Sequence, residues 1–376
     1  MRTKLLALTL LLLAAPATAQ VRVGIITSNS GPAASIGIPY AKGYAAWNAG
    51  PSDTGGKTLI ITQIDDASDP AVAARAAKKL IEDDHVDVIV GSAGTPASLA
   101  IYGVAAEAHV PMVLTANAGV PGERGMWEIT IPQPVPLMIA ADLPQMQKDG
   151  VKTIAFIGYS DAFGDLVYDS LKQIVEPAGI KVTMNERFAR ADTSVTPQIL
   201  KIIASRPDAV FTGGSASPGA LPHLALAERG YRGHVYSTHA IINSEFVRVG
   251  GAAVEGLIAP TGPMVVADQL PDSNPIKAVA LHFLELYEKA NKEKSTDAFA
   301  AYGYDALLIL ADAIKRTAGT PGTPEYRAAL RTALTTTTEL VGTHAIYTFK
   351  PGERYGTDER SRVIVRLDHG KWKLVE

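Results

Sequence analysis

Short apolar runs alternate with amphipathic stretches along the first third of the chain. Four runs are rich in β-branched residues and bounded by turn residues, as buried strands are: 21–26 (VRVGII), 58–64 (TLIITQI), 86–90 (VDVIV) and 111–116 (PMVLTA). Helical stretches lie between them at 36–48, 69–83 and 95–108. The last two open with Asp69-Pro70 and Thr95-Pro96, which predicts a side-chain N-cap followed by proline at the first helical position. This βαβ series predicts a parallel sheet with right-handed crossovers.

A second series of the same kind follows the proline-rich segment 131–136 (IPQPVP), which we expect to interrupt any regular element. Its predicted strands are 153–159, 180–188, 208–214, 234–240 and 255–262, and its predicted helices are 162–175, 197–205 and 218–229. Ser160 is expected to be the N-cap of the first of these helices. The fold class predicted from both series is α/β, with two doubly wound, Rossmann-like lobes.

The last third of the chain shows a different pattern of apolar and polar residues. Residues 271–294 and 298–319 read as two amphipathic helices with no strand between them. Such a pair must cover a sheet, and returning to the first lobe is one solution. The tail, 347–376, alternates like an antiparallel pair with a turn at Asp368-His369-Gly370. The residues alone do not say which lobe the tail joins.

The amino terminus carries the features of a secretory signal peptide over residues 1–19. Arg2 and Lys4 precede an apolar stretch that is too short to span a bilayer, and small residues follow, so we expect cleavage near Ala19. The chain has no cysteine, which excludes a lipid anchor on cysteine, disulfides and thiol catalysis. We therefore predict a periplasmic protein that is not inserted in the membrane.

Charge and composition limit the classes of partner and cofactor that the protein is expected to bind. The net charge of −3 becomes −5 once Arg2 and Lys4 are removed, and charges of both signs are dispersed, so neither nucleic acid nor an anionic membrane surface is indicated. The eight histidines show no metal-ligand spacing, and no GxGxxG motif is present. We expect no metal and no cofactor. A catalytic nucleophile with its base is also missing, which argues against an enzyme.

The stretch 91–100 (GSAGTPASLA) links a predicted strand to a predicted helix. In a doubly wound sheet, ligands bind at the carboxyl ends of strands, where helix N-termini offer unpaired N–H groups and a partial positive charge. The loop around Gly94 and Thr95 therefore suits a carboxylate or another small anion. The alternative is that Thr95 only caps its own helix.

Six longer segments carry a family resemblance: 23–37, 63–91 (with SDPAVA), 107–119 (with PMV), 161–165, 227–233 and 269–287. Together they resemble the leucine/isoleucine/valine-binding family of periplasmic solute-binding proteins of ABC transporters, and the resemblance covers essentially the whole mature chain. It implies two lobes joined by three crossovers, with 20–135 plus 265–342 in lobe 1 and 136–264 plus 343–376 in lobe 2. It also implies a monomer that closes over a solute and delivers it to permease subunits, and it places the helix pair on lobe 1.

The resemblance implies ligand positions residue by residue. Gly94-Thr95 matches the family's carboxylate-binding loop, whereas Gly119 stands where the second loop, Thr115 to Gly119, commonly has a threonine. Phe163 matches an aromatic position, and Ser215 follows a glycine pair where the family has an aromatic. The expected ligand-binding set is Ser30, Gly94, Thr95, Tyr102, Thr115, Asn117, Ala118, Gly119, Phe163, Ser215 and His239.

His239 departs most from the family pattern, because it aligns with the acidic residue that pairs with a substrate's ammonium group. A buried ammonium needs an anion beside it, and histidine cannot supply one. His239 could instead donate to a carboxylate or phenol oxygen, or pair with it as imidazolium. We therefore predict an organic acid without an α-amino group, with an aromatic carboxylate favoured. If the alignment is shifted, Glu245 or Asp161 would serve an amino acid, and a sensory ligand-binding module remains a further alternative.

Overall fold

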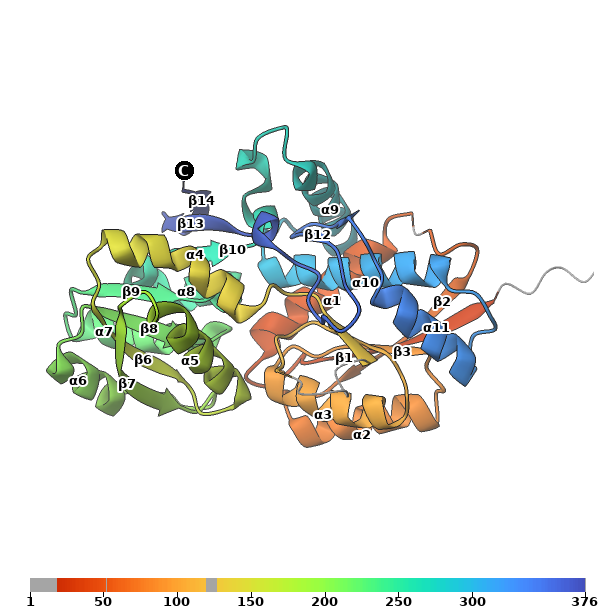
Figure 1. Cartoon of the computed structure of the whole chain (residues 1–376), viewed down its shortest axis with the longest axis horizontal. Helices are drawn as coiled ribbons and strands as arrows, with labels where there is room; N and C mark the ends of the chain where they lie inside the picture. Colours follow the sequence, from red (N-terminus) through yellow and green to blue (C-terminus); the bar gives the residue numbers. More distant parts are fainter. Residues whose placement is uncertain (1–18, 52, 120–126, 376) are drawn as a thin grey trace, which may run out of the picture.

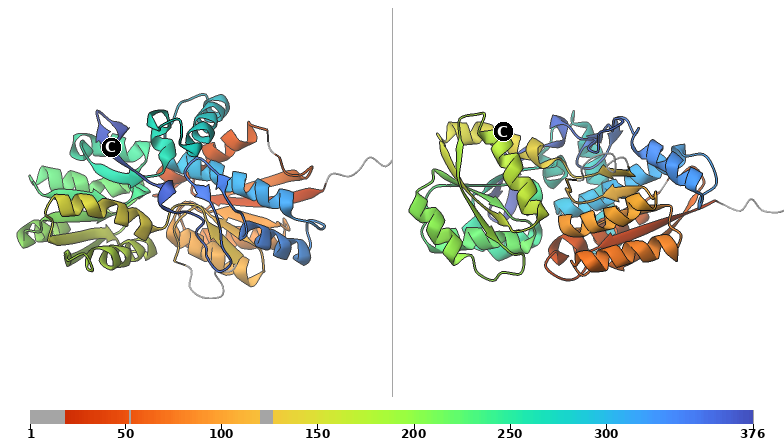
Figure 2. Two further views of the ribbon diagram at one scale, coloured as in Figure 1. Left: turned by 45° about the horizontal axis from the view of Figure 1, so that its top comes forward. Right: turned by 60° about the horizontal axis from the view of Figure 1, so that its bottom comes forward.

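Two lobes lie side by side along the long axis of the computed structural model, which describes residues 19–51, 53–119 and 127–375 (Figures 1 and 2). The predicted signal peptide, up to residue 18, lies outside the described residues. In the described part of the chain, no helix is long and apolar enough to cross a membrane. Each lobe is built on its own parallel sheet.

Lobe 1 contains a five-stranded parallel sheet in the order β2-β1-β3-β4-β5. Its strands are β1 (Gln20–Thr27), β2 (Thr58–Asp65), β3 (Val88–Gly91), β4 (Met112–Leu114) and β5 (Glu128–Thr130). Its first three helices are α1 (Ala34–Asn48), α2 (Pro70–Glu82) and α3 (Thr95–Glu107).

Alternate residues of these strands face opposite layers of helices. Val88 and Val90 join the core beneath α1, whereas Ile89 joins the core beneath α2 and α3. A strand buried on both faces has no polar side to expose, which explains the continuous apolar runs in the sequence.

Lobe 2 contains a four-stranded parallel sheet in the order β7-β6-β8-β9. Its strands are β6 (Thr153–Tyr159), β7 (Lys181–Phe188), β8 (Ala209–Gly213) and β9 (His234–Ser237). Its helices are α4 (Val135–Lys148), α5 (Ala162–Val175), α6 (Thr196–Ser205), α7 (Leu221–Glu228) and α8 (Ser244–Gly250).

Much of the C-terminal third of the chain packs on lobe 1. After β10 (Ile258–Thr261), helices α9 (Pro275–Asn291) and α10 (Ala298–Arg316) pack on α1, and α11 (Pro324–Leu334) packs on α10 (Figure 1). A short pair, β11 (Leu340–Val341) and β12 (Ile346–Tyr347), follows. The chain then crosses again to β13 (Val363–Asp368) and β14 (Lys371–Leu374).

The tail forms the predicted hairpin, and the structure supplies its place. β13 pairs antiparallel with both β14 and β10, so the hairpin and β10 together form a three-stranded sheet. His369 and Gly370, at the turn, both have positive φ angles, as a tight two-residue turn requires. The exact lobe boundaries predicted from the sequence stay a prediction.

Four local predictions were wrong. Helix α4 begins at Val135, within the proline-rich segment, because Pro136 lies in the first turn, where no N–H is needed. The N-cap of α3 is Gly94 rather than Thr95, and the N-cap of α5 is Asp161 rather than Ser160. His239 lies in a short 3-10 helix, η3 (His239–Ile241), beyond the end of β9, and not in the predicted strand.

Candidate functional site

A cavity of about 30 Å³ lies between the two lobes at the carboxyl ends of their strands. Lobe 1 contributes most of its wall, from α1, the loops after β3, β4 and β5, and the start of α10: Ile36, Tyr40, Ala93, Gly94, Thr95, Thr115, Ala116, Asn117, Pro132, Phe299 and Tyr302. Lobe 2 contributes Phe163, Arg190, Ser215, His239 and Ala240. This position matches the general rule for ligand sites in doubly wound sheets.

The start of α3 forms one end of the cavity. Gly94 is the N-cap in an extended conformation, and no side chain caps the helix. Thr95 is buried, and its hydroxyl donates to the backbone oxygen of Asn117 at 2.6 Å. Thr95 therefore does not cap its own helix, and the first N–H groups of α3 remain available to an anion, where the helix dipole also favours negative charge.

The loop after β4 forms the floor of the cavity. The Thr115 hydroxyl donates to the Ser92 carbonyl at 3.0 Å, and the Tyr40 hydroxyl donates to the Thr115 carbonyl. Asn117 Nδ2 donates to the Gln133 carbonyl at 3.0 Å, whereas its Oδ1 is buried without a partner. These bonds hold the loop through its backbone and leave one amide oxygen facing no protein donor.

Arg190 is the one charged side chain among the described residues that line the cavity. It lies in the loop after β7, with its side chain only 16% exposed. Its Nε donates to Asp161 at 2.6 Å, its Nη1 donates to Ser215 Oγ at 3.2 Å, and its guanidinium stacks 4.0 Å above the Tyr159 ring. The stacking and the two hydrogen bonds fix the cation at the cavity wall.

Asp161, an alternative partner for the ammonium group of an amino acid in the sequence analysis, already has partners within the protein. Its carboxylate pairs with Arg190 and also caps α5 by accepting from the N–H groups of Phe163 and Gly164. Glu245, the other candidate, lies outside the cavity and pairs with Arg248 at 2.6 Å. Among the described residues that line the cavity, none carries a carboxylate.

His239 lies at the cavity as an unprotonated imidazole. The side chain is buried, and burial together with the nearby His344 lowers its pKa to about 3. Its Nδ1 has no hydrogen-bond partner. The imidazolium form considered from the sequence is therefore disfavoured, and His239 offers one neutral donor and one neutral acceptor.

Aromatic rings form much of the remaining wall. Tyr40 and Phe299 meet edge to face, with ring centroids 5.7 Å apart, and Tyr302 contacts Phe299 at 6.2 Å. Phe163 faces them from lobe 2 and is nearly buried. Together with Ile36, they give the cavity an apolar body with few polar groups, as ligand sites usually have.

The structure brings seven of the eleven expected ligand residues to the cavity: Gly94, Thr95, Thr115, Asn117, Phe163, Ser215 and His239. The other four do not line it. Ser30 is exposed and donates to Asp65 at 2.7 Å, and Gly119 is exposed at the end of its loop. Tyr102 and Ala118 are buried in the core beneath α2 and α3.

Sequence reasoning missed Arg190 and the wall residues from α1 and α10. Arg190 follows a predicted strand, so the argument used for Gly94 and Thr95 could have found it. Tyr40, Phe299 and Tyr302 lie on helices whose apolar faces read as ordinary core. No pattern in the sequence separates a core aromatic from one at a cavity.

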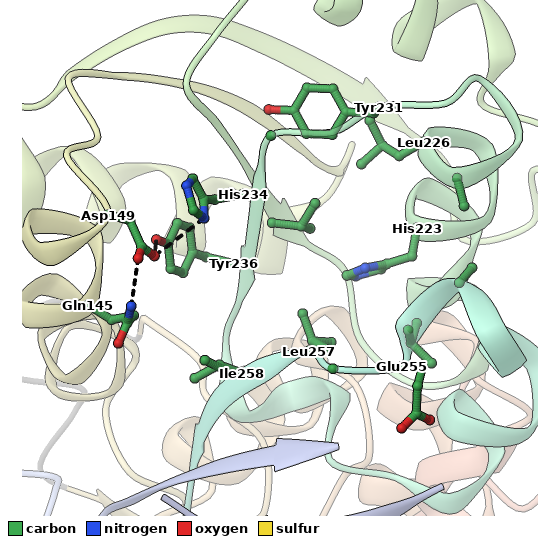
Figure 3. Close-up of a pocket in the computed structure, with 16 residues that line it drawn as sticks. Gln145, Asp149, His223, Leu226, Tyr231, His234, Tyr236, Glu255, Leu257 and Ile258 are labelled. Carbon is green, nitrogen blue, oxygen red and sulfur yellow. Dashed lines mark hydrogen bonds and ion pairs between the residues drawn. The ribbon is translucent and has the colours of Figure 1, made fainter. Parts of the chain in front are cut away.

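A second hollow, of about 270 Å³, opens in lobe 2 where β9 begins (Figure 3). Asp149 there accepts from Gln145 Nε2 at 2.7 Å and Tyr236 Oη at 2.6 Å, and lies 3.4 Å from His234 Nδ1. These contacts tie the end of α4 to β9. The hollow lies at the opposite ends of the strands from the interlobe cavity, and Asp149 is saturated by its neighbours.

Three potential metal-ligating side chains, Glu255, Asp368 and His369, gather at the β13–β14 turn. Glu255 accepts from the backbone N–H of His369 at 2.6 Å and from that of Gly370, and Asp368 pairs with Lys373. The cluster is explained by closure of the hairpin turn.

Comparisons with known proteins agree with this architecture. The family model described as "Periplasmic binding protein" matches residues 20–357. "Leu/Ile/Val-binding protein homolog 1" of Brucella suis is 26% identical over 306 residues, covering 80% of this chain and 79% of that protein. The "Leucine-, isoleucine-, valine-, threonine-, and alanine-binding protein" of Pseudomonas aeruginosa is 27% identical over 276 residues, covering 71% and 69%.

A solved structure gives a more extensive match. An extracellular ligand-binding receptor from Rhodopseudomonas palustris is 37% identical, with a TM-score of 0.90, and the match covers 96% of this chain and 100% of that one. The two-lobed architecture, the interlobe cavity and the matched family model agree. The chain therefore belongs to the periplasmic binding protein family and has its type I fold.

Proposed function

We propose that this protein is the periplasmic solute-binding component of an ABC importer and that its solute is a small organic acid without an α-amino group, favourably an aromatic carboxylate. The solute binds between the lobes, and the closed form is presented to the permease subunits. The observation that carries the ligand class is the charge of the cavity wall: Arg190 and the start of α3 favour an anion, and no described lining residue carries a carboxylate.

The electrostatic argument compares an acid with an amino acid of the same shape. Both would place a carboxylate near Arg190 or the α3 N–H groups. The amino acid would also bury an ammonium, and an unpaired charge in such a site costs several kcal/mol. Asp161 cannot supply the missing anion without releasing Arg190 and uncapping α5. The aromatic wall made by Tyr40, Phe163 and Phe299 suits a flat apolar body.

The second candidate is a branched-chain or other apolar amino acid. The names of the Brucella and Pseudomonas relatives favour it, because those proteins are described as binding leucine, isoleucine and valine or as homologues of such proteins. The apolar wall would accommodate an aliphatic side chain. The charge of the lining separates the two candidates, since only the amino acid requires a counter-ion for its ammonium.

The test uses pairs of compounds that differ only in the α-amino group. Purified protein, unfolded and refolded to remove any bound solute, would be titrated by calorimetry and thermal shift with 3-phenylpropanoate against phenylalanine, and with 4-methylpentanoate against leucine. Benzoate extends the aromatic set. We expect the acid of each pair to bind more tightly, and the aromatic acids to give the largest shifts. Tighter binding of leucine or phenylalanine than of the matched acid would overturn the proposal.

A further inference from the structure

Two polar atoms at the interlobe cavity have no hydrogen-bond partner in the described protein. They are Asn117 Oδ1 and His239 Nδ1, on side chains that are only 5% and 4% exposed. Leaving buried polar atoms unsatisfied is costly, and most such atoms in folded proteins are paired. Both atoms belong to residues that line the cavity, so its occupant is what can satisfy them.

The orientation of the Asn117 amide follows from its other contact. Its partner is the backbone carbonyl of Gln133, which can only accept, so the atom 3.0 Å away must be the NH₂ group. Gln133 is itself fixed, because its side chain accepts from Tyr302 at 2.5 Å and donates to the Ser361 carbonyl at 2.6 Å. The amide oxygen of Asn117 is therefore left as an acceptor that needs an O–H or N–H from the solute.

His239 adds a second neutral group of either polarity. Burial keeps the imidazole unprotonated, so one ring nitrogen donates and the other accepts. A hydroxyl is both a donor and an acceptor and carries no charge to be neutralised. It therefore suits a wall that has an amide oxygen and a neutral imidazole but no carboxylate.

We propose that the solute carries at least one neutral hydroxyl group in addition to its carboxylate, with Asn117 Oδ1 accepting from that hydroxyl and His239 as a second polar contact. This inference rests on the proposed function, because it places the carboxylate at Arg190 and the start of α3. It makes Asn117 the residue that discriminates a hydroxylated acid from its parent acid.

The experiment measures dissociation constants for parent and hydroxylated acids. Benzoate is compared with 2-, 3- and 4-hydroxybenzoate, and 3-phenylpropanoate with its 4-hydroxyphenyl analogue. We expect at least one hydroxylated acid to bind tenfold or more tightly than its parent, because the parent leaves the Asn117 oxygen unsatisfied. Equal affinity across every pair would overturn the inference, since it would mean that the hydroxyl is not recognised.

Two substitutions then locate the recognition. In Asn117→Leu, the ratio of parent to hydroxylated dissociation constants should fall to about one. Gln198→Leu is the matched control, because Gln198 also donates to a backbone carbonyl and has an unpartnered buried amide oxygen, but lies on α6 outside the cavity. Its ratio should equal that of the wild type. A ratio that survives Asn117→Leu would remove Asn117 from the role.

Two variants of His239 test the second polar contact, and they do so whether or not Asn117→Leu folds. His239→Gln keeps one neutral donor and one neutral acceptor, and should retain at least part of the preference, whereas His239→Leu should reduce it. Unchanged ratios in both His239 variants would remove His239 from the inference. If no acid binds the wild type and the amino acids do, the proposed function itself fails. If the acids bind without any preference for a hydroxyl, only this inference fails.

Discussion

Replacing Arg190 with methionine tests the charge of the cavity directly. Methionine keeps an unbranched apolar stem that can pack on Tyr159, while the cation is lost. Asp161 keeps the N–H groups of Phe163 and Gly164, so the N-cap of α5 remains in place. The change therefore removes the positive charge at the wall, together with its hydrogen bonds to Asp161 and Ser215, and keeps the N-cap of α5.

The magnitude follows from the burial of the guanidinium. At 16% exposure it is poorly screened by solvent, so a hydrogen bond from it to a carboxylate should contribute about 1.5–3 kcal/mol. We therefore expect the dissociation constant of the tightest organic acid to rise by about 10- to 150-fold. Isothermal titration calorimetry at low and moderate salt would measure it.

Arg187→Met is the matched control for this variant. Arg187 lies at the end of β7, stacks on Phe156 and Tyr168, and pairs with Asp165 at 3.1 Å, but it does not line the cavity. Its loss should change the dissociation constant by less than about twofold. The reasoning would be refuted if Arg190→Met weakened binding by less than threefold, or if Arg187→Met weakened it equally.

Three further outcomes follow from the structure. Gly43→Ala should lower the unfolding free energy by about 2–3 kcal/mol, because its Cβ would lie 1.9 Å from the Ala300 oxygen. Gly103→Ala, in an open part of α3, should raise the unfolding free energy by about 0.5–1 kcal/mol. Urea titrations measure both. Burial lowers the pKa of His223 to about 4, so the unfolded chain takes up a proton at this histidine before the folded chain does as the pH falls. The folded state therefore loses stability between pH 6.5 and pH 4. His223→Gln should remove up to about 3 kcal/mol of that loss, measured by unfolding curves at both pH values. Ser35→Ala removes the hydroxyl that accepts from the Ser217 N–H across the lobes at 3.0 Å, which should weaken solute binding about fivefold by titration; an unchanged affinity would mean that this contact does not stabilise the closed form.

Regular elements followed closely from the sequence where local signals and burial agreed. The predicted strand 153–159 and helix 162–175 coincide with β6 and α5, because a fully buried apolar run and an amphipathic stretch leave little choice of boundary. The N-caps were less certain, since Gly94 and Thr95 are both good cap residues. Only the tertiary contact of Thr95 with Asn117 shows which of them caps α3.

The part of the site that could be predicted is the part whose ligand-binding residues lie in a loop directly after a strand. Gly94 and Thr95 were found in this way. Asn117 and Ser30 entered the expected set with the family resemblance, and Ser30 turns outward to Asp65. Arg190 was missed because arginine in a polar loop normally reads as a solvated charge. Its role depends on the stacking and pairing that fold it inward, and these come from residues 29 positions away or more.

The division of the cavity between the lobes has a consequence for closure. Lobe 1 offers an anion only the partial charge of the α3 N-terminus, which contributes at most about 2 kcal/mol, whereas lobe 2 offers the guanidinium of Arg190, whose charge is shared with Asp161. Neither lobe surrounds the solute alone, so in the proposed function the bound anion stabilises the state in which both contacts are made at once. A ligand shifts such an equilibrium only by its differential affinity for the closed form. An acid whose carboxylate contacts only one of these two groups should therefore bind without closing the protein.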